Sequence, residues 1–282
     1  MILTATRYQL PEVLKGTILE QILEVKLREI EGAKQKLPAV SLGGALERAE
    51  PVRSLKKALL ARSPAIIAEI KKASPSAGIL RKDFNPTQIA REYEKNGAAA
   101  ISVVTEVHHF RGNLEDLACL RWAVRVPLVR KDFIVDPYQI LEARIAGADA
   151  VLLIASLLDT ISLGKLRQET EALGMEALVE IHDETELARA LEAGAALVGV
   201  NNRDLRTFET SLEVSLRLAP RLPKAVVSVA ESGIKGADDI LRLRKAGYRG
   251  FLIGEELMRA PSPGEALSGL LSACARAEKK AS

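Results

Sequence analysis

The sequence predicts an α/β protein, a single (β/α)8 TIM barrel preceded by a helical extension at its N-terminus. Three features of the 282-residue chain lead to this prediction: short apolar runs recur, segments with helical spacing separate them, and glycines follow the helical segments. Continuous apolar strands joined by helices form a parallel sheet that the helices cover. Eight such repeats over about 220 residues fit a closed barrel better than an open doubly wound sheet, which usually has five or six strands.

The segment ahead of the first repeat, residues 1–48, is the predicted extension, and residues 49–282 form the predicted barrel domain. Apolar residues recur at helical spacing within Gly16–Lys34, which predicts an amphipathic helix there. Its apolar stripe needs a surface to cover. We expect it to pack on the barrel, near the upper rim or across the lower face, in a monomer; a dimerisation arm is the alternative.

The predicted strands are apolar runs rich in β-branched residues. In chain order they are Ala65–Ile70, Ala98–Thr105, Val126–Val129, Ala148–Ile154, Glu176–Ile181, Ala196–Val200, Ala225–Val229 and Phe251–Ile253. Helical spacing between them is clear in Glu184–Ala195 and Ala237–Ala246. Strands and helices therefore alternate along the chain.

Capping residues mark the helix boundaries. Asn85, Asp136 and Ser262 each precede a proline suited to a first helical turn, and Asp183 with Glu186 has the spacing of a capping box. Helix ends are marked by glycines ahead of predicted strands, as left-handed C-caps require: Gly97, Gly147, Gly174, Gly194 and Gly247.

Composition excludes several functions. The net charge of +3 comes from interspersed acids and bases, and aromatic residues make up only 4% of the chain, so neither a basic surface nor stacking residues for nucleic acid are expected. No apolar stretch reaches the roughly 18 to 20 residues that span a bilayer. Met1–Arg7 lacks the order of a secretory signal, and Cys119 and Cys274 lie far apart. We therefore expect a cytoplasmic protein without membrane or nucleic-acid partners.

Polar and charged residues end several apolar runs, where a buried strand would carry only apolar side chains: Glu69, Lys71, Lys131, Glu180, Asn201 and Glu231. Burying a lone charge is costly, so each of these charges could be half of a structural ion pair. Their shared position at the C-terminal strand ends instead indicates one active site, because barrels place their active sites there. Lysines and carboxylates crowded around one mouth suit proton transfer.

Other chemistries have weaker support. No Ser/His/Asp order is evident, which disfavours nucleophilic hydrolysis. The spacing of His108, His109 and His182 is poor for a metal site, so we expect no metal and no cofactor, and we expect His182 to orient the turn after the fifth strand. A phosphate site is predicted at Ser232–Gly233 and Gly254–Glu255, after the seventh and eighth strands, where such barrels bind phosphate through backbone N–H groups.

The chain resembles the indole-3-glycerol-phosphate synthase family. Five stretches carry the resemblance, spread from residue 65 to residue 259: Ile67–Ser76, Arg130–Ile134, Leu178–His182, Val200–Leu205 and Ala230–Ile234. The resemblance implies a carbon–carbon carboxy-lyase of tryptophan biosynthesis. Its substrate would be 1-(2-carboxyphenylamino)-1-deoxyribulose 5-phosphate, which closes its ring and loses carbon dioxide and water to give indole-3-glycerol phosphate.

The resemblance also implies roles for the site residues. Lys131 would be the general acid at the substrate carbonyl, and Glu180 would assist dehydration. Lys71 would engage the substrate carboxylate and share the acid role, with Glu69 setting the position and charge of the lysines. Asn201 and Glu231 would hold substrate hydroxyls and the anilino nitrogen. The phosphate end would comprise Ser74, Arg203, Ser232, Gly233, Gly254 and Glu255, the last through its backbone.

The loop after the second strand departs from the family pattern, with Glu106 and His108–Phe110 where an Asp and paired aromatics are common. Two other functions stay open. Phosphoribosylanthranilate isomerase or another sugar-phosphate isomerase would rely on a Cys or Asp acid/base pair. A non-catalytic barrel that binds a phosphorylated ligand could do without Lys131 or Glu180.

Overall fold

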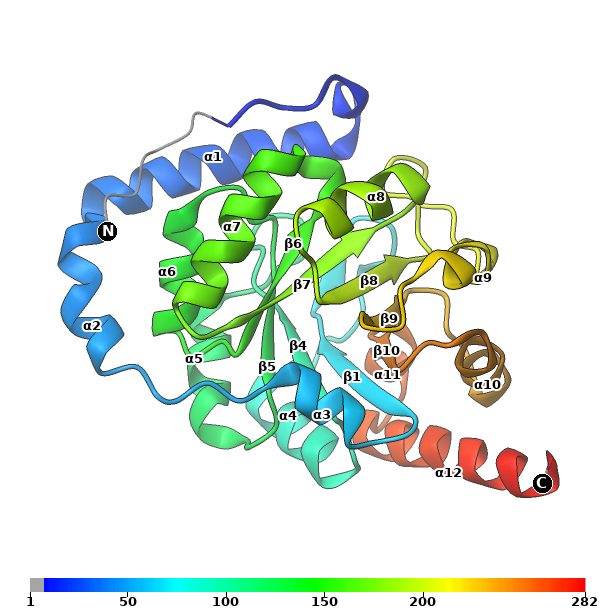
Figure 1. Cartoon of the computed structure of the whole chain (residues 1–282). Coiled ribbons are helices and arrows are strands. Elements are labelled where there is room, and N and C mark those ends of the chain that lie inside the picture. The colour runs from blue at the N-terminus through cyan, green and yellow to red at the C-terminus, as the bar shows by residue number, and fades with distance from the viewer. Residues whose placement is uncertain (1–7, 282) are drawn as a thin grey trace.

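A closed barrel of parallel strands confirms the predicted fold class (Figure 1). The computed structural model describes residues 8–281, so Met1–Arg7, the segment expected to lack a secretory signal, lies outside the described residues. Within residues 8–281 the strands pair in the order β1-β10-β9-β8-β7-β6-β5-β4, and β4 closes on β1. The barrel strands are β1 (Ala65–Ile70), β4 (Ala100–Val104), β5 (Leu128–Lys131), β6 (Ala150–Ile154), β7 (Glu176–Ile181), β8 (Leu197–Asn201), β9 (Val227–Glu231) and β10 (Gly250–Ile253).

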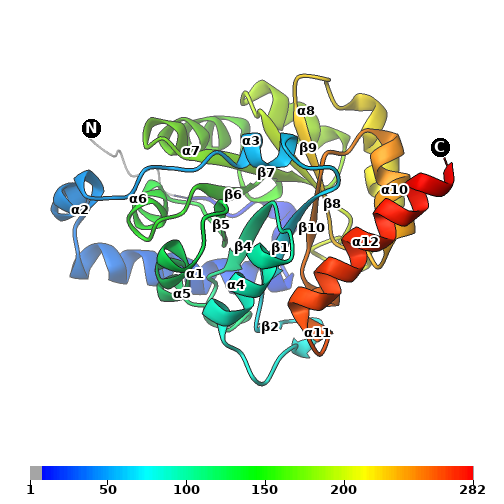
Figure 2. The same ribbon diagram turned by 90° about the horizontal axis from the view of Figure 1, so that it is seen from below.

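Helices follow the barrel strands and form the outer layer. In chain order they are α4 (Pro86–Lys95), α5 (Leu114–Ala123), α6 (Pro137–Ile145), α7 (Thr160–Ala172), α8 (Glu184–Glu192), α9 (Glu213–Leu218), α10 (Ala237–Ala246), α11 (Glu255–Arg259) and α12 (Pro263–Ala281). The last of them, α12, packs against both α4 and α10, which closes the helical layer where the first and last repeats meet (Figure 2). A short antiparallel hairpin, β2 (Ala73–Ser74) with β3 (Gly78–Ile79), follows β1.

The predicted helix boundaries have their physical basis in the caps. Asn85 and Asp136 accept hydrogen bonds from backbone N–H groups of the first turns of α4 and α6, and the five predicted C-cap glycines all have positive φ. The cap of α8 differs from the prediction. Asp183 accepts from the Glu186 N–H, but the Glu186 carboxylate accepts from the backbone N–H of His182 rather than that of Asp183.

The N-terminal segment packs on the barrel. Helix α1 (Ile18–Lys36) buries Leu19, Ile22, Leu23 and Ile30 in the same hydrophobic core as the strands, and it packs against α6. Figure 1 shows α1 above the strands, whereas α3 (Leu55–Leu60), which precedes β1, lies below them. A short helix, α2 (Gly43–Glu47), connects the two. The predicted division at residue 48 stays a prediction.

The interior of the barrel is apolar along most of each strand. All residues of β1, β4, β6, β8, β9 and β10 are buried, as is expected of strands covered on both faces. Among the helices of residues 8–281, none combines the length and the apolar character that a bilayer crossing would need.

Candidate active site

A cavity of about 320 Å³ opens at the C-terminal ends of the strands. Its volume lies in the range of small-ligand sites. The structure places all twelve predicted site residues in its lining: Glu69, Lys71, Ser74, Lys131, Glu180, Asn201, Arg203, Glu231, Ser232, Gly233, Gly254 and Glu255. Side chains that are up to 186 residues apart in the chain therefore converge, because successive parallel strands present their carboxyl ends to the same mouth.

Two lysines and three carboxylates form the charged floor of this cavity. Lys71 Nζ lies 2.6 Å from Glu69 Oε1, and Lys131 Nζ lies 3.0 Å from Glu180 Oε2 and 3.5 Å from Glu231 Oε2. The carboxylates of Glu69, Glu180 and Glu231 are buried. These ions are therefore largely removed from solvent and depend on one another for charge compensation.

The carboxylates around Lys131 fix its charge. Burial by itself would lower the pKa of the Lys131 ammonium, but Glu180, Glu231 and Glu69 outweigh burial and raise that pKa well above its usual value. Burial would likewise raise the pKa of Glu180, yet Lys131, His182 and a hydrogen bond from Asn201 Nδ2 at 3.1 Å bring it below the usual value. The resting site thus holds a protonated lysine beside an ionised carboxylate.

Glu231 behaves differently from the other two carboxylates. Burial, together with the negative charges of Glu180 and Glu69, raises the pKa of Glu231 to about 8, although Lys131 acts in the opposite direction. The polar neighbours of the buried Glu231 oxygens are the Lys131 ammonium, 3.5 Å from Oε2, and the Glu180 carboxylate. A carboxyl group that is protonated near neutral pH can donate to or accept from a ligand in the cavity.

Glycines leave the space that two of these carboxylates occupy. A Cβ atom at position 199 in β8 would overlap Glu231 Oε1, and a Cβ at Gly254 would overlap Glu69 Oε1. Any larger residue at either position would push a charged side chain out of the barrel interior. Gly254 was predicted as a phosphate-site residue, and the structure adds this second reason for a glycine there.

The residues of the predicted phosphate end also line the cavity. Ser232 and Gly233 follow β9 with positive φ values of 62° and 75°, and a Cβ at Gly233 would lie 2.7 Å from Thr210 Cγ2. Ser74 is buried, and its hydroxyl accepts from the Ala77 N–H at 3.2 Å. Successive backbone N–H groups in a turn can form an anion-binding concavity.

Arg203 spans the rim of the cavity. Its guanidinium donates to Ser76 Oγ at 2.9 Å and to Glu255 Oε2 at 3.3 Å, and Glu255 is also paired with Arg259 at 3.1 Å. Burial acts to raise the pKa of Glu255, but the two arginines outweigh it and lower that pKa. The negative charge of Glu255 beside the predicted phosphate end is therefore compensated by two guanidinium groups.

The prediction from sequence missed the aromatic part of the cavity. Phe110 and Phe133 both line it, with ring centroids 6.1 Å apart and ring planes at 46°. Phe110 belongs to the loop that departs from the family pattern, and the structure nevertheless brings its ring to the cavity. Phe133 stands in the Arg130–Ile134 stretch, where an aromatic residue two positions after the strand-end lysine was the available signal.

His182 contacts both its own turn and the charged floor. Its backbone N–H and its Nδ1 lie 2.8 and 3.0 Å from Glu186 Oε2, as expected of a residue that orients the turn after β7. Its Nε2 lies 3.5 Å from Glu180 Oε1. Hydrogen bonding to Glu186 and the charge of Glu180 raise the pKa of His182, although burial, the largest single influence, acts to lower it.

Comparisons with known proteins identify the family. The model of the family described as indole-3-glycerol phosphate synthase matches residues 19–270. The chain is 52% identical over 262 residues to the indole-3-glycerol phosphate synthase of Carboxydothermus hydrogenoformans, covering 90% of this chain and 99% of that protein. It is 49% identical over 257 residues to the enzyme of the same name from Salinibacter ruber, covering 90% and 95%.

Solved structures support the fold at lower identity. A 3-hexulose-6-phosphate synthase superposes with a TM-score of 0.60 at 19% identity, covering 74% of this chain and 99% of that one. A thiamine phosphate pyrophosphorylase from Pyrococcus furiosus superposes with a TM-score of 0.58 at 18% identity, covering 77% and 98%. The family match and the curated relatives confirm the predicted carboxy-lyase of tryptophan biosynthesis, and the chain belongs to the indole-3-glycerol phosphate synthase family.

Proposed function

We propose that Lys131 is the general acid for ring closure of 1-(2-carboxyphenylamino)-1-deoxyribulose 5-phosphate in this cavity. The ring carbon that bears the carboxylate attacks the ribulose carbonyl, and the carbonyl oxygen takes a proton from Lys131 as it gains negative charge. The observation that supports this most strongly is the position of the Lys131 ammonium between Glu180 and Glu231. Fixed, protonated and largely buried, it is ready to stabilise a developing oxyanion.

The remaining steps need a cation for the substrate carboxylate and a base for dehydration. Lys71, 2.6 Å from Glu69, is placed to hold the carboxylate until it leaves as carbon dioxide, which restores the aromatic ring. Glu180 then accepts a proton from the new five-membered ring and passes it to the departing hydroxyl group, which leaves as water; Asn201, which donates to Glu180, holds that carboxylate in place. Closure, decarboxylation and dehydration together release one carbon dioxide and one water and need no redox step.

Two ends of the cavity recognise two parts of the substrate. Phe110 and Phe133 supply an apolar wall for the carboxyphenyl ring, and Ser232, Gly233 and Arg203 lie where the phosphate would bind. Stacking or edge contacts with aromatic rings and N–H donors to phosphate are the matching interactions.

We also propose that the protein acts as a cytoplasmic monomer. Support for the monomer comes from α1, whose buried residues Leu19, Ile22, Leu23 and Ile30 pack into the core of their own barrel. Most of the apolar stripe of this helix is thereby covered within one chain. The dimerisation arm considered as the alternative would need that stripe to be available.

The test is fluorescence detection of indole-3-glycerol phosphate formed from the carboxyphenylamino substrate, in the presence of a chelator. Wild-type protein and Lys72→Met should form product at equal rates, because Lys72 adjoins Lys71 but does not line the cavity. Lys131→Met should form product at least about a thousandfold more slowly, the scale of combined acid catalysis and electrostatic stabilisation. Equal turnover by Lys131→Met would refute the assigned acid, and binding without turnover by the wild type would favour the non-catalytic barrel.

The isomerase alternative has less support. Such an enzyme would need a Cys or Asp acid/base pair at the mouth, whereas Cys119 lies in α5 and Cys274 in α12, in the outer helical layer. Neither cysteine lines the cavity. Asp132 does line the cavity, but both of its oxygens are held by neighbouring side chains and the Phe133 N–H. The same product assay separates the two reactions, because the isomerase reaction leads to the carboxyphenylamino ribulose and not to an indole.

A further inference from the structure

Each phenylalanine of the cavity wall is held by a buried carboxylate beside it. The backbone N–H of Phe110 donates to Glu106 Oε2 at 2.8 Å, and that of Phe133 donates to Asp132 Oδ1 at 2.9 Å. Glu106 also accepts from the backbone N–H groups of His108 and His109, so the whole turn that presents Phe110 wraps around one carboxylate. The orientation of these two carboxylates therefore governs where the two rings lie.

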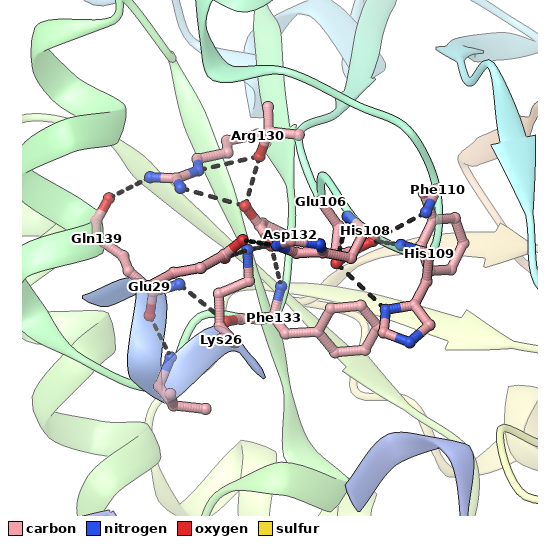
Figure 3. Close-up of polar contacts among 12 residues, drawn as sticks. Lys26, Glu29, Glu106, His108, His109, Phe110, Arg130, Asp132, Phe133 and Gln139 are labelled. Atoms are coloured by element: carbon pink, nitrogen blue, oxygen red, sulfur yellow. Dashed lines mark hydrogen bonds and ion pairs between the residues drawn. The ribbon is translucent and has the colours of Figure 1, made fainter. Parts of the chain in front are cut away.

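Helix α1 connects the two carboxylate-centred turns (Figure 3). Lys26 Nζ lies 3.1 Å from Asp132 Oδ1 and 2.7 Å from Glu29 Oε2, and Glu29 Oε1 lies 2.8 Å from His108 Nε2. One helical turn thus contacts the segment after β5 through Lys26 and the loop after β4 through Glu29. We call Lys26 and Glu29 the α1 brace.

The burial of Lys26 indicates that this contact is specific. The residue is only 5% exposed, and its partner Asp132 is 3% exposed. Taking two ions out of water carries a large desolvation penalty, which only good geometry and further hydrogen bonds offset. Asp132 has these bonds: Oδ2 accepts from Thr105 Oγ1 at 2.6 Å and from Arg130 at 3.2 Å, which leaves Oδ1 for Lys26 and the Phe133 N–H.

Neither residue of the α1 brace lines the cavity, so neither can contact a ligand bound there. We propose that Lys26 and Glu29 are positioning residues, which hold Phe110 and Phe133 at the spacing that receives the carboxyphenyl ring. The inference rests on the proposed function, since it assigns the aromatic wall to that ring. It predicts that loss of the brace weakens recognition of the ring and leaves recognition of the phosphate end intact.

The same helix offers a matched control. Lys34, two turns further along α1, pairs with Asp136 at 2.7 Å, and Asp136 also lies in the segment after β5. Its pair joins the same helix to the same segment, but it contacts neither phenylalanine and lies outside the cavity lining. Lys34→Met therefore removes a more exposed ion pair between the same helix and the same segment, without changing a residue that contacts the wall.

The experiment measures competitive inhibition by two fragments of the substrate, 2-aminobenzoate for the ring end and ribulose 5-phosphate for the phosphate end. Lys26→Met should raise the inhibition constant of 2-aminobenzoate and the KM about tenfold, a change in the range that a misplaced contact group produces. For Lys26→Met, the inhibition constant of ribulose 5-phosphate should stay within about twofold of the wild-type value. Lys34→Met should leave all three constants within that margin.

Glu29→Gln provides the second variant, because it keeps the shape of a partly exposed side chain while it removes the charge and one of the two acceptor oxygens. Glu29→Gln should raise the inhibition constant of 2-aminobenzoate, as Lys26→Met does. This variant keeps the test valid if Lys26→Met folds poorly. Equal losses for both fragments, equal effects of Lys26→Met and Lys34→Met, or no effect of Glu29→Gln would overturn the brace. Failure of the wild type to form product would instead refute the proposed function, and the brace with it.

Discussion

Glu231 Oε2 and Lys131 Nζ lie 3.5 Å apart in the floor of the cavity, yet the pKa values of both groups are raised. The lysine is stabilised in its charged form by several carboxylates, whereas burial and repulsion favour the neutral form of Glu231. Glu180 lies closer to the lysine, at 3.0 Å, and is the strongest of the carboxylate influences on the lysine pKa. Glu69 and Glu180, whose pKa values are lowered, are therefore ionised, whereas Glu231 is poised to change its charge near physiological pH.

The first prediction concerns stability and pH. The pKa of Glu231 is raised from 4.5 to about 8, so the folded protein holds a proton that the unfolded chain releases between these values. The stability that protonated Glu231 contributes is fully present below pH 4.5 and is lost as the pH rises through about 8. Glu231→Gln mimics the protonated form at every pH.

Urea unfolding at pH 5, 7 and 9 checks this. Relative to wild type, the free energy of unfolding of Glu231→Gln should increase with each step in pH. A difference that stays constant across the three values, or that changes in the opposite direction, would show that Glu231 ionises at an ordinary pKa.

The second prediction concerns the space beside Glu231. Gly199→Ala places a methyl group against Glu231 Oε1, which should displace the carboxylate, reduce kcat at least about tenfold and cost about 1 to 3 kcal/mol of stability. Gly250→Ala is the control, since its Cβ would meet Val229 Cγ2 at 3.0 Å near the opposite end of the barrel. It should cost stability without lowering kcat. Equal kcat values for the two variants would mean that the position of Glu231 is unimportant for turnover.

The third prediction concerns Arg203. Arg203→Ala removes the guanidinium that contacts Ser76 and Glu255, which leaves Glu255 with less compensation beside the phosphate end. KM should rise about tenfold or more, as for loss of a charge-assisted contact, with a smaller change in kcat. Arg206, an exposed residue of the same loop paired with Asp204, is the control. Steady-state kinetics measures both variants. If Arg206→Ala raised KM as much as Arg203→Ala, Arg203 would have no specific role.

The fourth prediction concerns the lower end of the barrel. Asp149 is fully buried just before β6, pairs with Arg121 at 2.8 Å and accepts the backbone N–H groups of Arg53 and Leu128. Asp149→Ala leaves a buried guanidinium without its carboxylate and should cost about 3 to 5 kcal/mol. Because the cavity lies at the opposite rim, kcat of the folded fraction should be unchanged. Denaturant unfolding measures the free energy of unfolding, and steady-state kinetics at one temperature measures kcat. A loss of kcat without a loss of stability would contradict a structural role for Asp149.

The order of strands and helices could be predicted because each repeat has its own local signals. Boundaries were less accurate where charged side chains found partners within the folded chain. The strand β5 was predicted to end at Val129, before the charges begin, but it continues to Lys131. Arg130 can stay buried there because its guanidinium donates to Gln139 O at 2.7 Å and to Asp132 at 3.2 Å. Nothing local in the sequence indicates that these partners are available.

The charged residues of the site could be predicted because they interrupt apolar strands, but their supporting contacts could not. Lys26 illustrates the difference. It lies four residues after Ile22 and four before Ile30, so it stands within the apolar stripe of its helix, and that position was the available signal. Its partner Asp132 is 106 residues away, and only the folded chain brings the two together.

The proposed function, with Lys131 acting at the substrate carbonyl between a ring end and a phosphate end, is tested most directly by a crystal structure with indole-3-glycerol phosphate bound. We expect the indole ring to lie against Phe110 and Phe133 and the phosphate to accept from the N–H groups of Ser232 and Gly233. The Lys131 ammonium should face the ring carbon that carried the carbonyl oxygen. A product bound in the reverse direction, or one that leaves Lys131 without contact to it, would contradict the account.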